Sequence, residues 1–498
     1  MSVSHRPNFA LTLRLAALLL ALTAPNALLA GGFELPDHGA RNVSRGGAFT
    51  ARADDLTALA LNPGGLLRAR DSQRAVGLPG QATATGMWGA LLYSHNAMHA
   101  PISFQRAPSA VPQPESSDPG SPAPLARVDN ETPWFLLGGS LFAATDFGLE
   151  DFVFAVGLYG PNAAGHQRYP VTGGQRYMLV ELEAIFVYYS AAIAWGKRDK
   201  YGVGVTLQLA HQPMTKLSLV VDGTPGGAQS PYHSSSDVLA TINLAAPPVP
   251  TALVGAWWRP IDAVEVGVSG RVVPVKLQAA GDVTLTNSPG GAAFFPDQLE
   301  IEGNAARLQL TIPQTARAGV RYRHLDGLRE RFDVELDVVW EGWSARDAYP
   351  VELDGMIKLF AATKAPDVTI AKRWKDTLSV RLGGTYNLDA LPLSLSAGTF
   401  YETAAVPLNY SHLDFPSFAR VGVGLGATGR LGSLDWTVGY LHVFQESRTI
   451  DEAFAKVFQQ RPVAECPEGC DGYDSVPANA GTITSGFHII TASLGWRF

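Results

Sequence analysis

The last residues of the chain, Thr484-Ser-Gly-Phe-His-Ile-Ile-Thr-Ala-Ser-Leu-Gly-Trp-Arg-Phe498, form the stretch that decides the fold. Apolar and aromatic residues occupy alternate positions from Ile490 to Phe498, and mostly small or polar residues stand between them. A period of two is typical of a β-strand whose two faces meet different surroundings. One apolar face and one polar face predict a strand between lipid and the lumen of a transmembrane barrel.

The C-terminal phenylalanine points to a cellular location. A terminal Phe498, preceded by apolar residues at alternate positions, resembles the closing-strand signal of bacterial outer-membrane barrels. We therefore expect the chain to meet the barrel-assembly machinery and outer-membrane lipids. The predicted location is the bacterial outer membrane, as a multi-pass β-barrel and a monomer.

The N-terminus agrees with export. Arg6 and Arg14 precede a Leu/Ala run from Leu15 to Leu22, and small residues lead to Ala30. This order predicts a secretory signal peptide over residues 1–30. The alternative is a retained membrane anchor, which we disfavour because the run is shorter than the roughly 20 residues that span a bilayer.

The amino-acid composition favours an all-β membrane protein and argues against a nucleic-acid-binding protein. The 51 glycines and 9% aromatic residues suit an all-β chain with many turns, and a mean hydropathy of +0.05 suits strands that expose only every second residue to lipid. The formal net charge is −7, and no basic stripe is present. We therefore expect no nucleic-acid partner.

Alternation and turn signals predict about fourteen strands. Short turns alternate with longer segments, as in a barrel with periplasmic turns, extracellular loops and both termini in the periplasm. We expect the strands near 84–96, 132–145, 151–160, 177–195, 201–216, 250–259, 262–277, 307–323, 331–345, 375–388, 391–404, 417–429, 433–448 and 482–498.

Single strands show which side faces lipid. Residues 332–340 carry Phe, Val, Leu, Val and Trp on even positions, with carboxylates between them that cannot face hydrocarbon. In the strand near 262–277 the apolar parity changes across Pro274, to Val275 and Leu277, which predicts a bulge. Gly422, Gly424 and Gly426 leave a smooth inward row.

Residues 31–80 lack alternation and precede the barrel, which we place at 81–498. The segment has a helix candidate at Ala53–Leu61 and then Asn62-Pro63-Gly64-Gly65, where proline and glycine end regular structure. We predict a hatch that fills the lumen. In contrast, residues 100–127 are rich in Pro and Ser and predict a solvated loop.

Charged residues on inward parities predict a polar lumen. They could meet a substrate carboxylate, but we favour ion pairs that satisfy one another and hold the hatch, because buried charges are normally paired. The set comprises Arg271, Arg317, Arg321, Asp333, Glu335, Asp337 and Arg381.

No catalytic motif is evident in the sequence. Gly424, Gly426 and Gly429 match a dinucleotide-binding spacing, but within a strand that offers no helix N-terminus for a phosphate. Cys466 and Cys470 lie in a predicted extracellular loop, for which we expect a disulfide and no metal site. The sequence thus predicts neither an enzyme nor a cofactor.

Several short motifs run in order along nearly all of the mature chain. They are Gly32-Phe33 with Ala40-Arg41 and Arg45-Gly46, Asn62-Pro63-Gly64-Gly65-Leu66, Val156-Gly-Leu-Tyr159-Gly-Pro161, Gln175-Arg-Tyr177, Leu310-Thr-Ile-Pro313, Val339-Trp340 with Trp343, and the terminal Phe498. Together these motifs resemble the FadL/TodX-type (OMPP1) outer-membrane transporters of long-chain fatty acids and aromatic hydrocarbons.

The resemblance implies a fourteen-stranded barrel with a hatch in its lumen. Hydrophobic ligand is then captured among extracellular loops, passes when the hatch moves, and leaves sideways into the bilayer through an interruption in the third strand. The family's N-P-A hatch motif falls on Asn62, Pro63 and Gly64, with glycine in place of alanine, and Phe33 joins the predicted gate.

The same resemblance places the lateral opening at Gly160, Pro161 and Asn162. Proline supplies no N–H to a ladder, so an unpaired edge is expected there. The alternative is that Pro161 merely begins an extracellular loop.

Two apolar loop regions, near 217–249 and 278–305, are candidates for the capture groove, although such residues could equally pack on each other. The residues are Leu217, Leu219, Val221, Phe294 and Phe295. The expected partner is a hydrophobic small molecule, a fatty acid or a hydrocarbon. An outer-membrane lipid hydrolase and an adhesive barrel that uses its long loops remain the alternatives.

Overall fold

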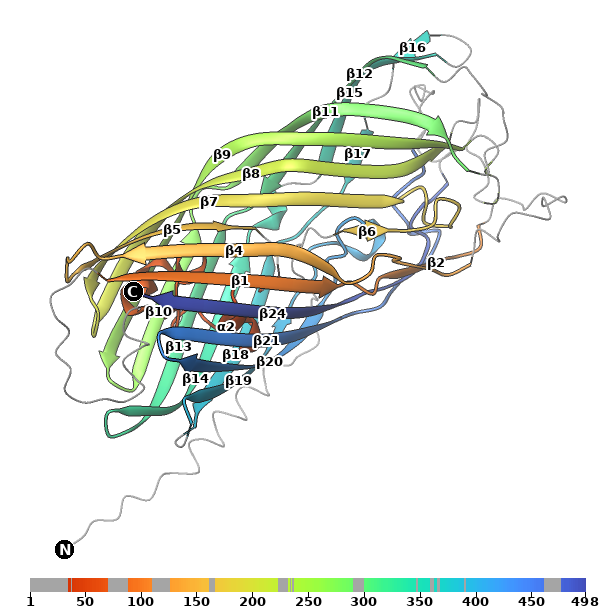
Figure 1. Cartoon of the computed structure of the whole chain (residues 1–498). Helices are drawn as coiled ribbons and strands as arrows, with labels where there is room; N and C mark the ends of the chain where they lie inside the picture. Colours follow the sequence, from red (N-terminus) through yellow and green to blue (C-terminus); the bar gives the residue numbers. More distant parts are fainter. Residues whose placement is uncertain are drawn as a thin grey trace, which may run out of the picture.

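Antiparallel pairing runs around the molecule in the computed structural model and closes it into a barrel of fourteen strands (Figure 1). The first wall strand, β1 (Gly89–His99), pairs with β24 (Gly486–Arg497) on one side and with β4 (Phe135–Thr145) on the other. The closing strand predicted from the C-terminus is therefore the strand that seals the barrel, and the predicted fold class is confirmed.

The structure describes most of the chain. The described residues are 35–36, 38–69, 88–109, 126–160, 166–222, 232, 234, 237–289, 300–345, 348–358, 362–364, 368–388, 391–460 and 476–498. No helix among them is long and apolar enough to cross a membrane.

Some wall positions hold two or more consecutive strands. The wall continues from β4 through β5 (Phe152–Tyr159), β6 (Gln167–Arg168), β7 (Glu181–Lys197), β8 (Tyr201–Asp222), β9 (Asp237–Ile261), β10 (Val264–Arg271), β11 (Val275–Asn287), β12 (Glu300–Ile312), β13 (Thr315–Asp326), β14 (Arg329–Glu341), β15 (Ala348–Lys358), β16 (Ala362–Lys364), β17 (Val368–Ala371), β18 (Thr377–Asn387), β19 (Leu393–Glu402), β20 (Arg420–Leu431) and β21 (Leu434–Gln445).

Short hairpins join the strands at one end of the barrel, which we call the turn end and which also holds Phe498 (Figure 1). Longer connections lie at the other end, the loop end, together with the short 3-10 helix η3 (Leu408–Tyr410), whereas the 3-10 helix η2 (Trp343–Ala345) lies in the break between β14 and β15 of the wall. A second sheet also covers the loop end. Its strands are β2 (Ser103–Arg106), β3 (Val128–Asp129), β22 (Arg448–Ile450) and β23 (Gly481–Thr484).

The wall carries its apolar side chains outward where the sequence predicted them. Val334, Leu336 and Val338 of β14 are exposed, whereas Asp333 and Glu335 between them are buried in the lumen. The outer surface is therefore the apolar one, as a barrel in lipid requires.

The predicted parity change at Pro274 is wrong. β10 ends at Arg271 and β11 begins at Val275, and the even positions stay outward on both sides of the break. Val275 and Leu277 point inward and are fully buried, while Lys276 is exposed. The same parity therefore faces inward in β10 and β11. The outward residues change from apolar to polar, as expected where the wall leaves the hydrocarbon region.

Several predicted strand limits also need correction. Residues 217–222 and 237–249, expected in a loop, belong to the long strands β8 and β9. The predicted strand near 307–323 is two strands, β12 and β13, and β2 lies within the segment expected to be a solvated loop. The inward side of these strands stays apolar beyond the stretch that faces lipid. The alternation of apolar and polar residues therefore did not show where each strand ends.

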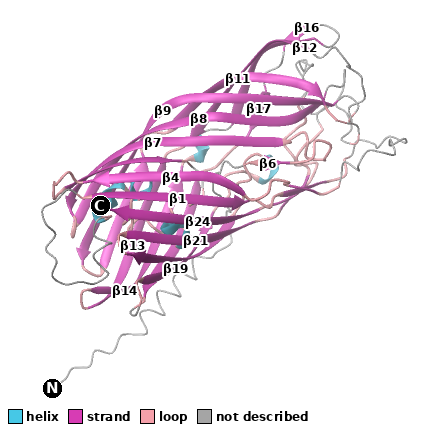
Figure 2. Cartoon of the chain, viewed as in Figure 1, coloured by secondary structure: helices cyan, strands magenta, loops and turns pink. Residues whose placement is uncertain are grey.

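The hatch fills the turn-end half of the barrel, where Figure 2 shows short helices enclosed by strands. Its helices are α2 (Ala40–Ser44), α3 (Ala58–Leu61) and the 3-10 helix η1 (Pro63–Arg68). The predicted helix at 53–61 is thus shorter than expected, and α2 was not predicted. The predicted signal peptide lies outside the described residues.

Candidate functional site

The hatch is held in the lumen by two carboxylates of β14. Asp337 accepts hydrogen bonds from the backbone N–H groups of Phe49 and Thr50, each at 2.9 Å. Glu335 accepts from the next two N–H groups, those of Ala51 and Arg52, at 2.7 and 3.1 Å. Four consecutive backbone donors of the hatch therefore bond to two buried carboxyl groups of one wall strand.

Hatch arginines reinforce this attachment. Arg45 contacts Asp333 at 2.7 Å and Glu335 at 3.0 Å, and Arg52 contacts Asp333 at 2.5 Å. All of these side chains are buried. Removing either partner would leave a buried charge without its counter-ion, so this network opposes displacement of the hatch.

A second anchor is the Asn62-Pro63-Gly64 turn. The Asn62 amide donates to the carbonyls of Thr50 in the hatch and Ala256 in β9, at 2.9 and 3.0 Å, and its side-chain oxygen accepts from the Gly64 N–H at 3.2 Å. Glycines of the wall receive this turn, since a Cβ on Gly204 would lie 2.6 Å from the Pro63 carbonyl group. The motif is therefore a close backbone contact between hatch and wall.

The predicted lumen charges divide between hatch and wall. Arg321 pairs with Glu265 at 2.7 Å and with Asp333 at 3.3 Å, which joins the wall to the hatch network. Arg381 lies 3.7 Å from Glu402 and donates to the Gly47 carbonyl at 3.5 Å.

The other two predicted arginines point elsewhere. Arg271 donates to the Tyr188 hydroxyl at 3.3 Å and to the Pro313 carbonyl at 3.4 Å, and Arg317 is half-buried on β13. The carboxylates of β14 therefore meet hatch groups and Arg321 rather than Arg271 or Arg381, with which the sequence had grouped them.

The hydrogen-bonded ladder of the wall is interrupted between β4 and β7, and we call this interruption the opening. β5 pairs with β4 only over residues 141–145, and β6 pairs with β7 only at Glu181 and Leu182. Among the described residues, positions 135–140 of β4 and 183–187 of β7 therefore pair on one side only. In Figure 1 β5 accordingly ends well before its neighbours β4 and β7.

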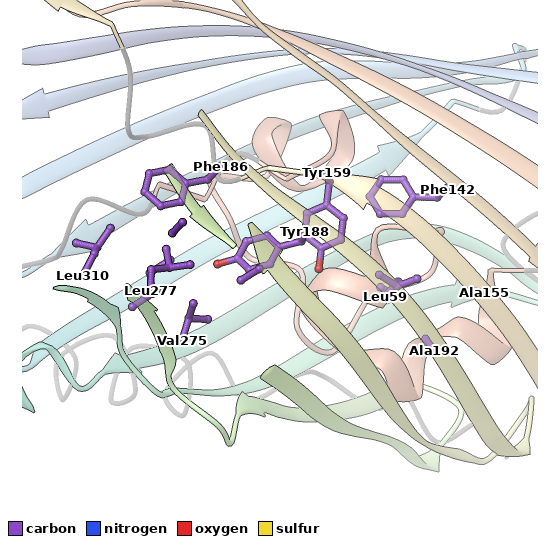
Figure 3. Close-up of a cluster of buried hydrophobic side chains, with 14 of the residues drawn as sticks. Leu59, Phe142, Ala155, Tyr159, Phe186, Tyr188, Ala192, Val275, Leu277 and Leu310 are labelled. Carbon is purple, nitrogen blue, oxygen red and sulfur yellow. The ribbon is translucent and has the colours of Figure 1, made fainter. Parts of the chain in front are cut away.

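Three aromatic side chains lie on the inner face of the wall, on the turn-end side of this opening. Phe142 of β4, Tyr159 of β5 and Tyr188 of β7 follow one another with ring centroids 5.5 Å apart in each pair. Figure 3 shows these rings beside Leu59 of the hatch and Phe186 of β7, with Val275, Leu277 and Leu310 beyond them. The opening therefore adjoins a continuous apolar surface that includes the hatch.

Two polar groups interrupt that surface. Gln208 donates to the Tyr159 hydroxyl, and Arg271 donates to the Tyr188 hydroxyl and lies over its ring. Both hydroxyls are thus satisfied within the protein, and the three rings are buried among apolar side chains. Aromatic rings bind hydrocarbon without a directional requirement.

The structure describes only part of the predicted site. Gly160 follows β5 directly, and a Cβ there would collide with the Phe186 carbonyl oxygen, so the chain passes β7 closely at this point. Leu217, Leu219 and Val221 are buried on β8, packed with residues of the segment 177–182. Phe33, Pro161, Asn162, Phe294, Phe295, Cys466 and Cys470 lie outside the described residues.

The apolar cluster that contains Phe142, Tyr159 and Tyr188 extends to a group of rings that was not predicted. Trp374 packs edge-to-face on Trp343 and Tyr349, at 4.8 and 5.3 Å between ring centroids, and Phe415 lies 6.4 Å from Trp374. The rings come from separate loops and strands, so only their aromatic character could have indicated them.

A buried charged triad lies beside these rings. Asp414 contacts Lys372 at 2.6 Å and His412 at 2.7 Å. Burial lowers the pKa of His412 below its usual value, although Asp414 opposes this. Burial would raise the pKa of Asp414, but His412 and Lys372 outweigh it and hold the pKa below its usual range. No local sequence signal brings these three residues together.

A family model described as outer membrane protein transport protein (OMPP1/FadL/TodX) matches residues 140–498. No curated protein matches the sequence.

Solved structures share the fold at low identity. A Pseudomonas aeruginosa FadL homologue is 16% identical and has a TM-score of 0.66, covering 94% of this chain and 99% of its own. The Pseudomonas putida toluene transporter TodX is 12% identical with a TM-score of 0.62, over 93% and 99%. The Ralstonia pickettii toluene transporter TbuX is 11% identical with a TM-score of 0.59, over 94% and 100%.

Proposed function

The chain belongs to the OMPP1/FadL/TodX family of outer membrane transport proteins, and we propose that it carries hydrophobic small molecules across the outer membrane without an energy source. Family membership supports transport, and the toluene transporters among the similar structures support an apolar cargo. In this proposal the loop end faces the outside and the turn end faces the periplasm. The fatty-acid or hydrocarbon identity of the cargo belongs to the proposal.

The observation that carries the proposal is the aromatic-lined opening between β4 and β7. A polar solute would gain nothing from Phe142, Tyr159 and Tyr188, whereas an apolar one gains about 25 cal/mol for each Å² that it buries. The buried charged network below holds the hatch across the axial route. The apolar route therefore leads sideways.

Lateral exit follows from the same energetics. A hydrocarbon chain gains about 0.8 kcal/mol per CH₂ group when it leaves water, so release from an apolar site into water would be costly. Release into the lipid beside the opening exchanges one apolar environment for another. In our proposal the loops capture the cargo, a movement of the hatch near Leu59 lets it reach the aromatic rings, and it leaves between β4 and β7.

The test is to narrow the opening without touching the hatch anchors. Ala184 lies on β7 where it pairs on one side only, and it packs at the edge of the apolar cluster. Ala184→Trp should reduce uptake of a long-chain fatty acid or toluene several-fold. The matched control is Ala191→Trp, which faces outward on the same strand where β5 pairs fully. Parental uptake by Ala184→Trp, at normal surface abundance, would reject lateral exit here.

The alternatives have weaker support. A lipid hydrolase would need a nucleophile and a base on the wall, and a lipase activity lost on one Ser→Ala change would revive that idea. An adhesive role would depend on the loops, and deletion of residues 105–125 would then abolish cell attachment while leaving uptake intact.

A further inference from the structure

We propose that the turn end of the barrel contains a binding site for an anion that carries carboxylate or phosphate groups, and that the bound anion fastens the hatch to the wall. The site is a cavity of about 340 Å³ that lies between the hatch and the turn-end rim of the wall. It is distinct from the aromatic-lined opening. The inference rests on the proposed function only for the orientation that puts this end in the periplasm.

Arginine dominates the lining of this cavity. Among the described residues it is lined by nine arginines and five carboxylates, and every basic side chain there is an arginine. The arginines are Arg41, Arg52, Arg68, Arg259, Arg321, Arg323, Arg329, Arg430 and Arg497. Guanidinium groups bind carboxylates and phosphates through paired hydrogen bonds, which the single ammonium of lysine cannot reproduce.

The carboxylates nearby do not saturate these donors. Glu265 alone receives Arg68 at 3.0 Å, Arg259 at 2.7 Å and Arg321 at 2.7 Å, and Arg323 approaches it at 3.4 Å. A carboxylate offers about four acceptor sites, whereas each guanidinium carries five N–H donors. Glu330 also accepts from Arg321 and Arg323, and Asp333 contacts Arg321. Together the four guanidinium groups still carry more N–H donors than these three carboxylates can accept.

The charge balance points the same way. Glu265 and Asp333 lie directly behind the lining, and counting them still leaves two more guanidinium groups than carboxylates among the described residues. On the opposite side, Arg430 and Arg497 both contact Asp435. A concave site with surplus positive charge attracts anions, and its walls weaken the screening by water.

These arginines come from both the hatch and the wall, which the anion would join. Arg41, Arg52 and Arg68 belong to the hatch, whereas Arg259, Arg323 and Arg497 belong to the wall. An anion with two or more charged groups can accept from both sets at once. The cavity volume suits a small molecule such as a tricarboxylate or a pyrophosphate, near the lower limit of ordinary ligand pockets.

The test measures binding to the purified full-length protein, so its outcome does not depend on transport. Thermal unfolding would be followed with citrate, with pyrophosphate and with sodium chloride at matched ionic strength. We expect a saturable rise in Tm with citrate or pyrophosphate and only a small, non-saturating change with chloride. A separate arm with phosphatidylglycerol micelles asks whether an acidic lipid headgroup supplies the same chemistry.

The variant pair is Arg323→Gln with Arg497→Gln, which removes one guanidinium group from each side of the cavity. The control is Arg127→Gln, an exposed arginine far from it at the loop end. We expect the double variant to weaken the citrate or pyrophosphate effect at least tenfold in concentration, while the control responds like the parent. If the double variant fails to fold, Arg323→Gln alone replaces it.

Three results would overturn the proposal. They are equal Tm shifts for citrate and chloride, an unchanged anion response in the variant, or a response that Arg127→Gln also loses. Stabilisation by phosphatidylglycerol alone would reject a soluble anion and assign the site to lipid headgroups.

Discussion

The two halves of the lumen are built from opposite chemistry. Toward the turn end, the hatch is fixed by directional contacts between charged groups, such as Arg45 with Asp333 and the N–H groups that face Asp337. Next to the hatch and toward the middle of the barrel, Phe142, Tyr159 and Tyr188 belong to a buried apolar cluster near an unpaired edge of the wall. The directional contacts of a charged network fix one position of the hatch. An apolar surface has no such directional requirement and can accept many ligands.

Under the proposed function, this difference would leave the barrel closed to water and open to hydrocarbon. Water and ions would meet the hatch and its ion pairs on the axial route. In that proposal an apolar solute needs no axial route, because it leaves the barrel beside the aromatic rings through the interruption at β5. The predictions below separate the two halves.

The largest effect should come from removing the hatch. Deletion of residues 31–74 leaves the wall strands intact, so a folded barrel should still form and run as a heat-modifiable band. The lumen would then be unfilled, and planar bilayer recordings should show a change from a silent protein to an ion-conducting pore. A deletion variant as silent as the parent would contradict the assignment of this segment as the plug.

A smaller effect should follow when the hatch remains but its anchors lose their charge. Glu335→Gln with Asp337→Asn keeps the side-chain size but weakens the hydrogen bonds to residues 49–52. Bonds to charged groups contribute about 1.5–3 kcal/mol each. We expect transient conductance in bilayers and faster amide exchange at residues 49–52.

The matched control for these anchors is Asp326→Asn, which removes a carboxylate from an exposed turn. It should behave like the parent in both measurements. Parental exchange rates in the Glu335→Gln, Asp337→Asn protein would show that the hatch is held by packing alone.

The smallest effect should be a pH response confined to the loop end. The folded-state pKa values of His412 and Asp414 are both lowered, so both groups contribute stability at neutral pH that is lost as the pH falls. For His412 the loss of stability begins as the pH drops through about 6.5, the ordinary pKa of a histidine side chain. Amides of residues 405–418 should therefore exchange several-fold faster at pH 5 than at pH 7.

His412→Gln should flatten the part of this response above pH 5, whereas His324→Gln near the turn end should leave it unchanged. A turn-end hatch that loosens in parallel with the loop end would show that the two halves are not independent.

The sequence predicted the features that depend on a local repeating pattern. It did not predict the features that depend on contacts between distant segments. Alternation identified the outward face of β14, the closing strand and the smooth row of glycines on β20, because each depends on a local period of two. The end of α3 before Asn62 was also predicted, since proline ends an α-helix locally, but the 3-10 helix η1 that begins at Pro63 was not.

Other features could not be read from local pattern. Arg45 and Glu335 are 290 residues apart, and nothing in either segment indicates that they meet. The full length of β8 and β9 was missed because their inward apolar residues continue beyond the part that faces lipid. The cluster at Asp414 likewise depends on loops that only the closed barrel brings together.

The most direct test of lateral exit is to map where a hydrophobic ligand touches the protein. A long-chain fatty acid or an alkylbenzene with a diazirine group would be bound to the purified protein, activated by light, and its adducts located by mass spectrometry. The account predicts adducts on peptides that carry Phe142, Tyr159, Phe186 or Tyr188 at the edges of the opening. Adducts confined to the turn-end cavity, at peptides that carry Arg259 or Arg323, would show that the ligand passes along the barrel axis and would contradict it.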